Sequence, residues 1–328
     1  MQSPIWAECA ARAFYADHDV AIMHAGAESQ PKVIAPLGKL RSEVLWRYEI
    51  LGAEKLGEPV DLLYESADEL RDFLDGFYKL GIPLFIKRML ADSPTLDVLT
   101  DEYSTRCLFF SRPAGATPWL SFDDGAKDPE ARFDSGRRSD FRRAMRKAGT
   151  FGKVEVDVSL PAEDDLDRLL DDALEVESAG WKGREGSALR YDQARHQFFR
   201  DYALAACRLG QLRMGFLRID GKAAAMMIAV EQSKRLWLLK VGYDEKFKTC
   251  SPGVLLLMEG VRAAMSNGLE GVEFLGTEAP WTKVWTQVTR PCIAFRAYPA
   301  RPRGLATLAA DAAMRSGERL MQRYRPWG

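Results

Sequence analysis

The sequence predicts a mixed α/β fold arranged in two domains. The chain has 328 residues, whereas a domain typically has roughly 150. Strand and helix patterns alternate along the first half, which favours mixed α/β layers over an all-β barrel. In the second half, three strand patterns follow one another and lead into an apolar helix pattern.

Composition limits the kinds of site that the chain can carry. The apolar fraction is 47%, the charged fraction 28% and the net charge -1, so no global field recruits nucleic acid or acidic lipid and any basic site must be local. The five cysteines form no C-x-x-C pair, which argues against a zinc site or a disulfide framework. Only His18, His24 and His196 supply imidazoles. We therefore expect no metal site and no Ser-His-Asp triad.

The chain also lacks targeting and membrane-spanning patterns. Residues 1–20 have neither the basic start nor the apolar run of a signal peptide. No window approaches the roughly 20 apolar residues that span a bilayer. We expect a cytoplasmic protein with reduced thiols and no transmembrane segment, with a peripheral position at the inner face of the membrane as an alternative.

Short strands and a few helices are expected in the first half. Ser66 followed by Glu69 is typical of a capped helix start, and this helix extends to Leu80 before Gly81 and Pro83 end it. A second, short helix is expected near Leu96. Strands are expected at 20–24, 32–37, 44–50, 60–64, 84–86 and 107–110.

A strongly basic helix is expected at 134–148. Asp134 and Ser135 provide its cap, and Gly149 ends it. The segment from Arg132 to Lys153 contains eight basic and two acidic residues, which gives it a local net charge of +6. The helix is either a solvated connector or a basic wall that holds phosphate or another anionic group.

The second half gives clearer patterns. The Asp220-Gly221 pair is the strongest hairpin signal in the chain, and a looser turn is expected at 232–235. Strands are expected at 154–158, 212–219, 223–230, 236–243, 271–275 and 293–298, and helices at 166–176, 191–209, 251–267 and 302–324.

The start of the 251–267 helix has the features of an anion site. Pro252 suits the first helical position, Ser251 is a good cap, and Gly253 leaves the backbone uncovered. Free amides and the helix dipole attract anions there. The strand at 236–243 precedes this start, so a ligand that crosses from the strand to the helix would meet backbone donors on both sides.

Several motifs around this helix occur in an order that resembles a known family. They are Glu177-Ser-Ala-Gly-Trp-Lys-Gly, Gly221-Lys-Ala-Ala-Ala, Lys240-Val-Gly-Tyr-Asp-Glu, Ser251-Pro-Gly-Val-Leu-Leu and Lys283-Val-Trp. From about Lys153 to Pro299, the chain resembles the GNAT acyltransferases, in particular the CelD-type branch related to the Fem peptidyl transferases. The family's wider glycine-rich phosphate loop is reduced here to Gly253.

This resemblance implies two tandem GNAT-like domains, each a mixed central sheet flanked by helices. The first is a divergent domain at 1–133, joined by the basic connecting helix at 134–152 to an acyltransferase domain at 153–328 that ends in a C-terminal helix. The resemblance also implies acetyl-CoA or another acyl-CoA as co-substrate, with its pyrophosphate at the helix start. The implied cofactor-binding residues are Lys240, Val241, Ser251, Gly253, Val254 and Leu255.

Four residues are candidates for catalysis. An amine must lose a proton before it attacks a thioester, and Asp244 and Glu278 are the candidate carboxylates. Asp244 could equally cap a turn; Glu278 is favoured because it follows a strand end. Tyr243 could protonate the departing thiolate or simply pack. Lys283 matches a lysine that Fem-type relatives place near the reacting group, or it is a surface lysine.

The candidate substrate-binding residues lie in two places. Trp181 and Lys182 suit a loop over a sugar or phosphate, although Trp181 could instead fill the core at a hinge. Arg138 and Arg142 lie on the basic helix.

The leading functional hypothesis is an N-acyltransferase that moves an acetyl or similar group from acyl-CoA to an amine. The expected acceptor is an amino sugar of a polysaccharide or cell-envelope precursor, either a small molecule or a lipid- or nucleotide-linked sugar. One alternative is Fem-like transfer from aminoacyl-tRNA, although the net charge and the lack of long heptads favour no nucleic-acid partner. Another is a non-catalytic regulatory module in which Arg138 and Arg142 clamp a cyclic dinucleotide.

Overall fold

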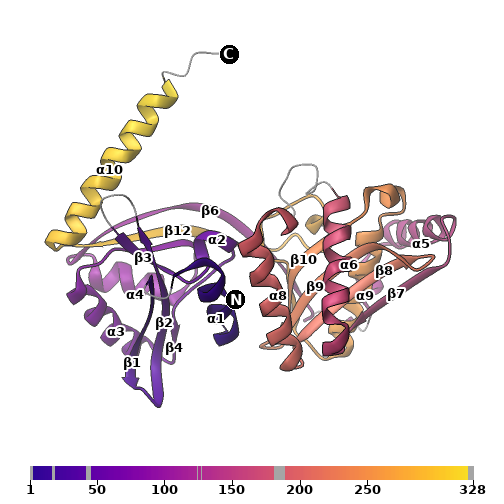
Figure 1. The fold of residues 1–328 in the computed structure, drawn as a ribbon, viewed down its shortest axis with the longest axis horizontal. Helices are drawn as coiled ribbons and strands as arrows, with labels where there is room; N and C mark the ends of the chain where they lie inside the picture. The colour runs from indigo at the N-terminus through magenta and orange to yellow at the C-terminus, as the bar shows by residue number, and fades with distance from the viewer. Residues whose placement is uncertain are drawn as a thin grey trace. The chain divides into compact units, whose positions relative to one another are not determined.

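A computed structural model describes residues 3–16, 19–41, 46–123, 125–126, 128–180 and 189–323. It divides into two compact units (Figure 1). Unit 1 contains Met1–Gly115 and Pro291–Gly328, and unit 2 contains Ala116–Arg290. Each unit has a mixed sheet flanked by helices, which confirms the expected fold class.

The unit 1 sheet combines antiparallel and parallel pairs. Its strands occur in the order β1 (Val20–Ala27), β2 (Gln30–Arg41), β3 (Trp46–Ile50), β5 (Leu84–Leu90), β12 (Thr289–Pro299) and β6 (Cys107–Ser121), with β4 (Leu63–Tyr64) beside β2. β3 and β5 are parallel, whereas β1–β2, β2–β3 and β5–β12 are antiparallel. The helices of this unit are α1 (Pro4–Phe14), α2 (Ala53–Leu56), α3 (Ala67–Leu80), α4 (Pro94–Tyr103) and α10 (Pro302–Arg323).

The structure confirms the expected helix after Ser66. The Ser66 hydroxyl accepts a hydrogen bond from the Glu69 amide at 3.5 Å, and Gly81 ends the helix in a left-handed conformation. The apolar face of α3, including Phe73 and Phe77, packs into the unit 1 core. Two expectations fail in this half. The strand expected at 60–64 keeps only two residues, and α1 has no counterpart among the expected elements.

The boundaries of the two units differ from those of the expected domains. β12 pairs with β5 from Cys292 opposite Leu90 to Ala297 opposite Leu84. The final strand and α10 are therefore part of unit 1 rather than of the unit that precedes them in the chain. A strand's partner is set by long-range pairing, and the local pattern at 293–298 contains no signal for it.

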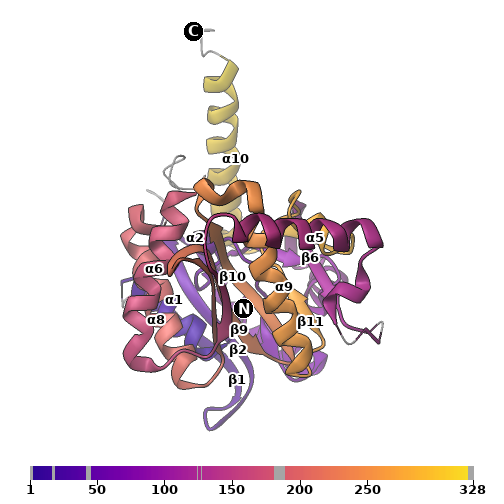
Figure 2. The ribbon, with the colours of Figure 1, turned by 90° about the vertical axis from the view of Figure 1, so that its right-hand side faces the viewer.

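Unit 2 contains the helix start singled out from the sequence. Its strands occur in the order β7 (Val154–Ser159), β8 (Leu212–Ile219), β9 (Lys222–Gln232), β10 (Arg235–Tyr243), β11 (Gly271–Glu273) and the end of β6. β7 to β10 are antiparallel, and β11 is parallel to β10. The helices are α5 (Ser135–Gly149), α6 (Leu166–Ala179), α8 (Gln193–Arg208) and α9 (Pro252–Ser266). Figures 1 and 2 show α6 and α8 on one face of this sheet and α9 on the other.

Two tight hairpins join the central strands of unit 2. Asp220 and Gly221 both have positive φ, 47° and 76°, which confirms the predicted turn. Ser233 and Lys234 also have positive φ, 50° and 57°, so the second turn is as short as the first. No glycine marks it, and for this reason the sequence predicted a looser connection.

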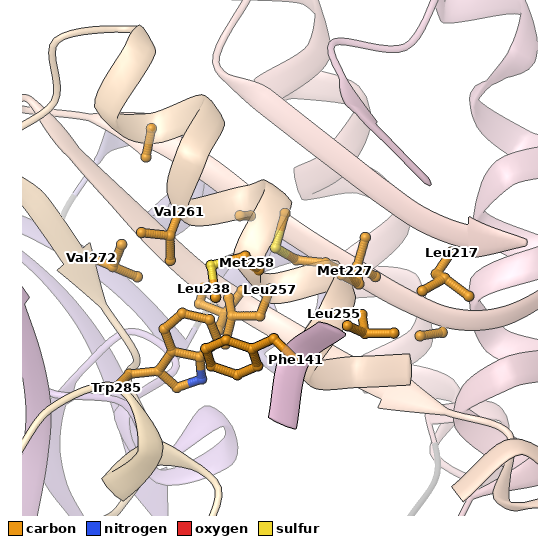
Figure 3. Packing of buried hydrophobic residues seen from close by; sticks show 14 of the residues in the cluster. Phe141, Leu217, Met227, Leu238, Leu255, Leu257, Met258, Val261, Val272 and Trp285 are labelled. Atoms are coloured by element: carbon orange, nitrogen blue, oxygen red, sulfur yellow. The ribbon is translucent and has the colours of Figure 1, made fainter. Parts of the chain in front are cut away.

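The core of unit 2 lies between the sheet and α9. Figure 3 shows Met227 of β9 and Leu238 of β10 packed against Leu257, Met258 and Val261 of α9. The five cysteines are all buried, and none of them forms a disulfide in the part of the chain that the structure describes. In the part of the chain that the structure describes, no helix is both long and apolar enough to cross a membrane.

Candidate functional site

A cavity of about 310 Å³ lies in unit 2, where β10 ends and α9 begins. Its walls come from the last turn of α6, the second half of β10, the short helix η5 (Glu245–Cys250), the first turns of α9 and the segment around the short helix η6 (Thr282–Val284). The residues that line it are Glu177, Gly180, Val241, Gly242, Tyr243, Lys248, Ser251, Gly253, Val254, Leu257, Trp281 and Trp285.

The strand pairing explains why β10 can form a wall of this cavity. β10 pairs with β11 only from Arg235 to Trp237. Its pairing with β9 shifts register between Leu238 and Lys240 and continues to Tyr243. The last three residues of β10 lie beyond the β11 ladder and line the cavity.

The first turn of α9 forms the second wall. Pro252 lies at the helix start as expected, but Ser251 is left-handed (φ 48°, ψ 51°) and its side chain makes no capping bond. Side-chain capping requires an extended cap residue, so the predicted serine cap is wrong. The Val254 and Leu255 amides donate to the Ser251 carbonyl. Among the described residues, the Gly253 amide has no hydrogen-bond partner, and it remains as the free donor of this turn.

Positive charge lies close to this helix start. Lys248 lines the cavity and is exposed. The C-terminal end of the basic helix α5 lies beside η5. Here the ring centroids of Phe151 and Phe247 are 5.6 Å apart, and Lys147 Nζ lies 5.7 Å from the centroid of the Phe151 ring. Figure 2 shows α5 crossing over the end of α9. An anion at the start of α9 would therefore lie in a locally positive field.

Trp285, which lines the cavity, belongs to a cluster of aromatic side chains. The Trp285 ring stacks on Phe141 of α5, with centroids 6.4 Å apart, and both rings meet Phe133 edge-on (Figure 3 shows the stacked pair). Trp285 is 7% exposed, and its buried Nε1 has no hydrogen-bond partner within the described ranges. Burying an N–H group without a hydrogen-bond partner costs about 1–3 kcal/mol of stability. A ligand carbonyl oxygen that accepts a hydrogen bond from Nε1 would remove this cost.

A buried carboxylate, Glu177, also lines the cavity. Glu177 is 2% exposed and its Oε2 accepts a hydrogen bond from the Leu189 amide at 2.9 Å. The end of α6 lies close to β10, because a Cβ at Gly242 would lie 3.4 Å from the Glu177 Cα and one at Gly180 would lie 3.0 Å from the Tyr243 carbonyl oxygen.

The candidate catalytic residues do not gather at one point. Tyr243 lines the cavity. Asp244 caps η5, since its Oδ1 accepts from the Lys246 amide at 2.9 Å. Glu278 and Lys283 are exposed and pair with each other, Nζ to Oε1, at 2.6 Å. Of these four residues, only Tyr243 lines the cavity.

Four of the six candidate cofactor residues line the cavity: Val241, Ser251, Gly253 and Val254. Leu255 is instead buried in the hydrophobic core, and the Lys240 ammonium lies 4.6 Å from the centre of the Phe199 ring.

The candidate substrate residues lie away from the cavity or outside the described part. Arg138 is half-buried and Arg142 exposed on α5, and neither lines the cavity. Trp181 and Lys182 lie outside the described residues. In the described ranges, no group of three or more His, Cys, Asp or Glu side chains could hold a metal ion.

Sequence reasoning missed two polar residues of the cavity. Lys248 lies three positions before Ser251, so a search for cations beside the helix start would have found it. Glu177 lies four residues after Ala173 and seven after Leu170, both buried on α6. A carboxylate on the apolar stripe of a helix was therefore the available signal.

Comparison with known proteins agrees with this geometry. Residues 135–283 match the family model described as an acetyltransferase (GNAT) domain. A search of the curated proteins found no match. The family match and the position of the cavity indicate an acyltransferase with a GNAT domain.

Solved structures share the fold over most of the chain. FemX has a TM-score of 0.63 at 12% identity and covers 94% of this chain and 93% of its own. A conserved protein of unknown function from Bacteroides thetaiotaomicron has a TM-score of 0.57 at 13% sequence identity. The match covers 89% of this chain and 90% of that protein. The C-terminal domain of a candidate lysylphosphatidylglycerol synthetase from Agrobacterium fabrum has a TM-score of 0.55 at 13% sequence identity. The match covers 93% of this chain and 91% of that domain. At such identities the likeness shows the fold alone, and the CelD-type branch stays a prediction.

Proposed function

We propose that this chain is a GNAT-type N-acyltransferase that binds acyl-CoA in the cavity between β10 and α9. The observation that carries the proposal is the joint position of Gly253, Lys248 and the end of β10 around one cavity. A helix start with a free amide and a nearby cation suits phosphate, and the apolar interior suits a pantetheine arm with its acyl group.

The residues that line the cavity would hold the donor from its pyrophosphate to its acyl group. The Gly253 amide, the Ser251 hydroxyl and Lys248 would hold the pyrophosphate, with α5 supplying additional positive charge. Val241 and Val254 would contact the arm, and the unpaired Trp285 Nε1 would donate to one of its carbonyl oxygens. Tyr243, which also lines the cavity, would protonate the departing thiolate.

For the acceptor, we propose an amine such as the amino sugar of a polysaccharide or cell-envelope precursor. Arg138 and Arg142 would then hold a phosphate of a nucleotide- or lipid-linked acceptor, because they lie on the basic helix that borders η5. Because neither arginine lines the cavity, they suit a large acceptor better than a small free amine.

Aminoacyl transfer is the second candidate, and the fold shared with FemX favours it. In this case the same cavity would take the aminoacyl end of a charged tRNA in place of acyl-CoA. The two candidates differ in the donor, so donor binding separates them. A regulatory module would bind a cyclic dinucleotide and neither donor.

Isothermal titration with acetyl-CoA, CoA, an aminoacyl-tRNA and cyclic di-GMP tests these alternatives. We expect saturable binding of acetyl-CoA and CoA, weakened about 5- to 10-fold in Lys248→Ala, in line with the loss of one charge-assisted contact. Lys246→Ala is the matched control, because Lys246 is exposed on the same short helix but does not line the cavity. Absence of binding by either CoA form at millimolar concentration would contradict the proposal.

A further inference from the structure

The outer face of α5 carries a cluster of cations that the proposed transfer uses only in part. Phe141 and Ala148 hold the opposite face of this helix in the core, where α5 crosses the end of α9 (Figure 2). Residues four positions apart share one side of a helix. Two pairs of exposed cations have this spacing, Arg142 with Arg146 and Arg143 with Lys147.

Carboxylates of the chain compensate little of this charge. Across the described ranges, Arg143 is the only one of the four that forms an ion pair, with Asp140 at 3.2 Å. The neighbouring η5 adds Lys246 and Lys248, both exposed. The arginines of α6 and α8 differ, because several are paired: Arg168 with Asp165, Arg200 with Asp167 and Arg208 with Glu163. A surface with so few counter-charges of its own attracts a partner that carries many negative charges.

Two large apolar side chains are exposed beside the cations. Met145 is 38% exposed and Phe151, which follows the helix, is 41% exposed. Together with the four cations they form what we call the α5 surface: Arg142, Arg143, Met145, Arg146, Lys147 and Phe151. Clustered cations with exposed apolar groups among them match the boundary between the headgroups and the acyl chains of an anionic bilayer.

A nucleic acid would use the cations of this surface but not its apolar groups. Single strands bind where bases stack on free aromatic rings. The Phe151 ring already has Lys147 Nζ 5.7 Å from its centroid and Phe247 packed at 82° to its plane. Met145 gains nothing from phosphates, whereas it leaves water when it enters lipid. The apolar members of the α5 surface therefore favour a bilayer.

We propose that the α5 surface docks this protein on an anionic lipid bilayer. Its cations bind the headgroup phosphates, while Met145 and Phe151 enter the boundary below them. The α5 surface adjoins η5, whose Lys248 lines the cavity. A lipid-linked acceptor would then reach the cavity from the bilayer. That consequence rests on the proposed function, whereas the docking itself does not.

The experiment measures co-sedimentation of the full chain with vesicles, in the absence of any acyl donor. One set of vesicles is phosphatidylcholine alone, and the other contains about 30% phosphatidylglycerol, enough to give a negative surface potential. The charge variant combines Arg143→Gln, Arg146→Gln and Lys147→Gln. Its matched control combines Arg168→Gln, Arg200→Gln and Arg208→Gln, which removes the same net charge from α6 and α8. The apolar variant combines Met145→Ser with Phe151→Ser.

We expect binding to the anionic vesicles and none to phosphatidylcholine alone. Binding should weaken as the salt concentration rises from about 0.1 to about 0.5 M, because salt screens exposed charges. The charge variant should partition at least about tenfold less, since each Lys or Arg near an anionic surface contributes several-fold. The apolar variant should lose about fivefold, because less apolar area leaves water. The control should bind as the unsubstituted protein does, and melting temperatures show that all variants are folded.

Several results would overturn the docking proposal and leave the proposed function untouched. They are no binding to anionic vesicles, equal binding to both kinds of vesicle, and equal losses in the charge variant and its control. Binding of bulk tRNA that is lost in the charge variant, without vesicle binding, would make the α5 surface a nucleic-acid site instead. Failure to bind acetyl-CoA in the titration above would instead contradict the proposed function and leave docking untouched.

Discussion

The Phe141 ring stacks on the Trp285 indole, with centroids 6.4 Å apart and 17° between the ring planes. Phe141 belongs to the basic helix α5, and Trp285 lines the cavity. The contact fixes a cationic helix against the wall of the site. The basic segment is therefore packed against the site through Phe141 rather than being a wholly solvated connector.

Phe141→Ala should lower the free energy of unfolding of unit 2 by about 3–5 kcal/mol, the usual cost of removing a buried aromatic ring. Phe141 is 7% exposed and touches both Phe133 and Trp285. Urea unfolding provides the measurement. Phe151→Ala is the control, since Phe151 is 41% exposed, and it should cost less than half as much. Equal losses of unfolding free energy in the two variants would show that the Phe141–Trp285 contact stabilises the unit no more than an exposed phenylalanine does.

Trp285→Phe should weaken acetyl-CoA binding about 5- to 10-fold, because it removes the buried indole N–H that would donate to a carbonyl oxygen. The melting temperature should hardly fall, because the variant also removes an unpaired buried donor. Trp281→Phe is the control from the same cavity. Titration of S-ethyl-CoA, which lacks the thioester carbonyl, tells whether the thioester or an amide of the arm accepts the bond. Unchanged affinity in Trp285→Phe for all ligands would rule this contact out.

Gly253→Ala should separate stability from ligand binding. A Cβ at this position would lie 3.5 Å from Tyr243 Cδ1, an ordinary contact, and alanine is better than glycine in a helix by up to about 1 kcal/mol. The protein should therefore be as stable as before or more so. The added methyl group lies at the start of α9 and should reduce CoA affinity about tenfold, because phosphate needs close approach to the backbone.

Gly149→Ala provides the comparison, because Gly149 is the last residue of α5 and a Cβ there meets nothing within 4 Å. It should keep full CoA affinity. A Gly253→Ala protein that binds CoA normally would contradict the placement of the pyrophosphate.

Unit 1 should lose stability as the pH rises from about 4.5 to about 7, because of Glu49. Burial raises the pKa of Glu49 from 4.5 to about 7, although hydrogen bonds from Tyr15 and the Glu54 amide act in the opposite direction. The folded state holds this proton more tightly than the unfolded state. The resulting stabilisation is complete below pH 4.5 and disappears as the pH rises to about 7.

The effect should be on the order of 3 kcal/mol between pH 4.5 and 8. It is measured by urea unfolding of the unsubstituted protein and Glu49→Gln across this pH range. The variant should lack this part of the pH dependence. Parallel curves for the two proteins would show that Glu49 does not titrate as its burial implies.

Local patterns predicted most elements of unit 2. The Asp220-Gly221 turn and the strands on either side follow from residues that are adjacent in sequence. The partner of β12 did not follow, because β5 lies about 200 residues earlier in the chain and register is a tertiary property. The left-handed Ser251 also escaped prediction, since serine before proline is typical of an extended cap.

The candidate site was predicted by its helix start rather than by its acidic residues. Gly253 and Tyr243 line the cavity as they would for a cofactor site. Glu278 was chosen by analogy with strand ends, but β11 ends at Glu273 and leaves Glu278 in the exposed segment that follows. Glu177 was hidden in a helix pattern, and only the fold brings the end of α6 close to the end of β10.

Hydrogen–deuterium exchange with and without acetyl-CoA tests the central claim most directly. We predict slower exchange in peptides that cover 241–257 and 281–285, with no change in peptides of β1 to β5. No protection at millimolar acetyl-CoA, or protection confined to 135–149, would contradict an acyl-CoA site at the end of β10 and the start of α9.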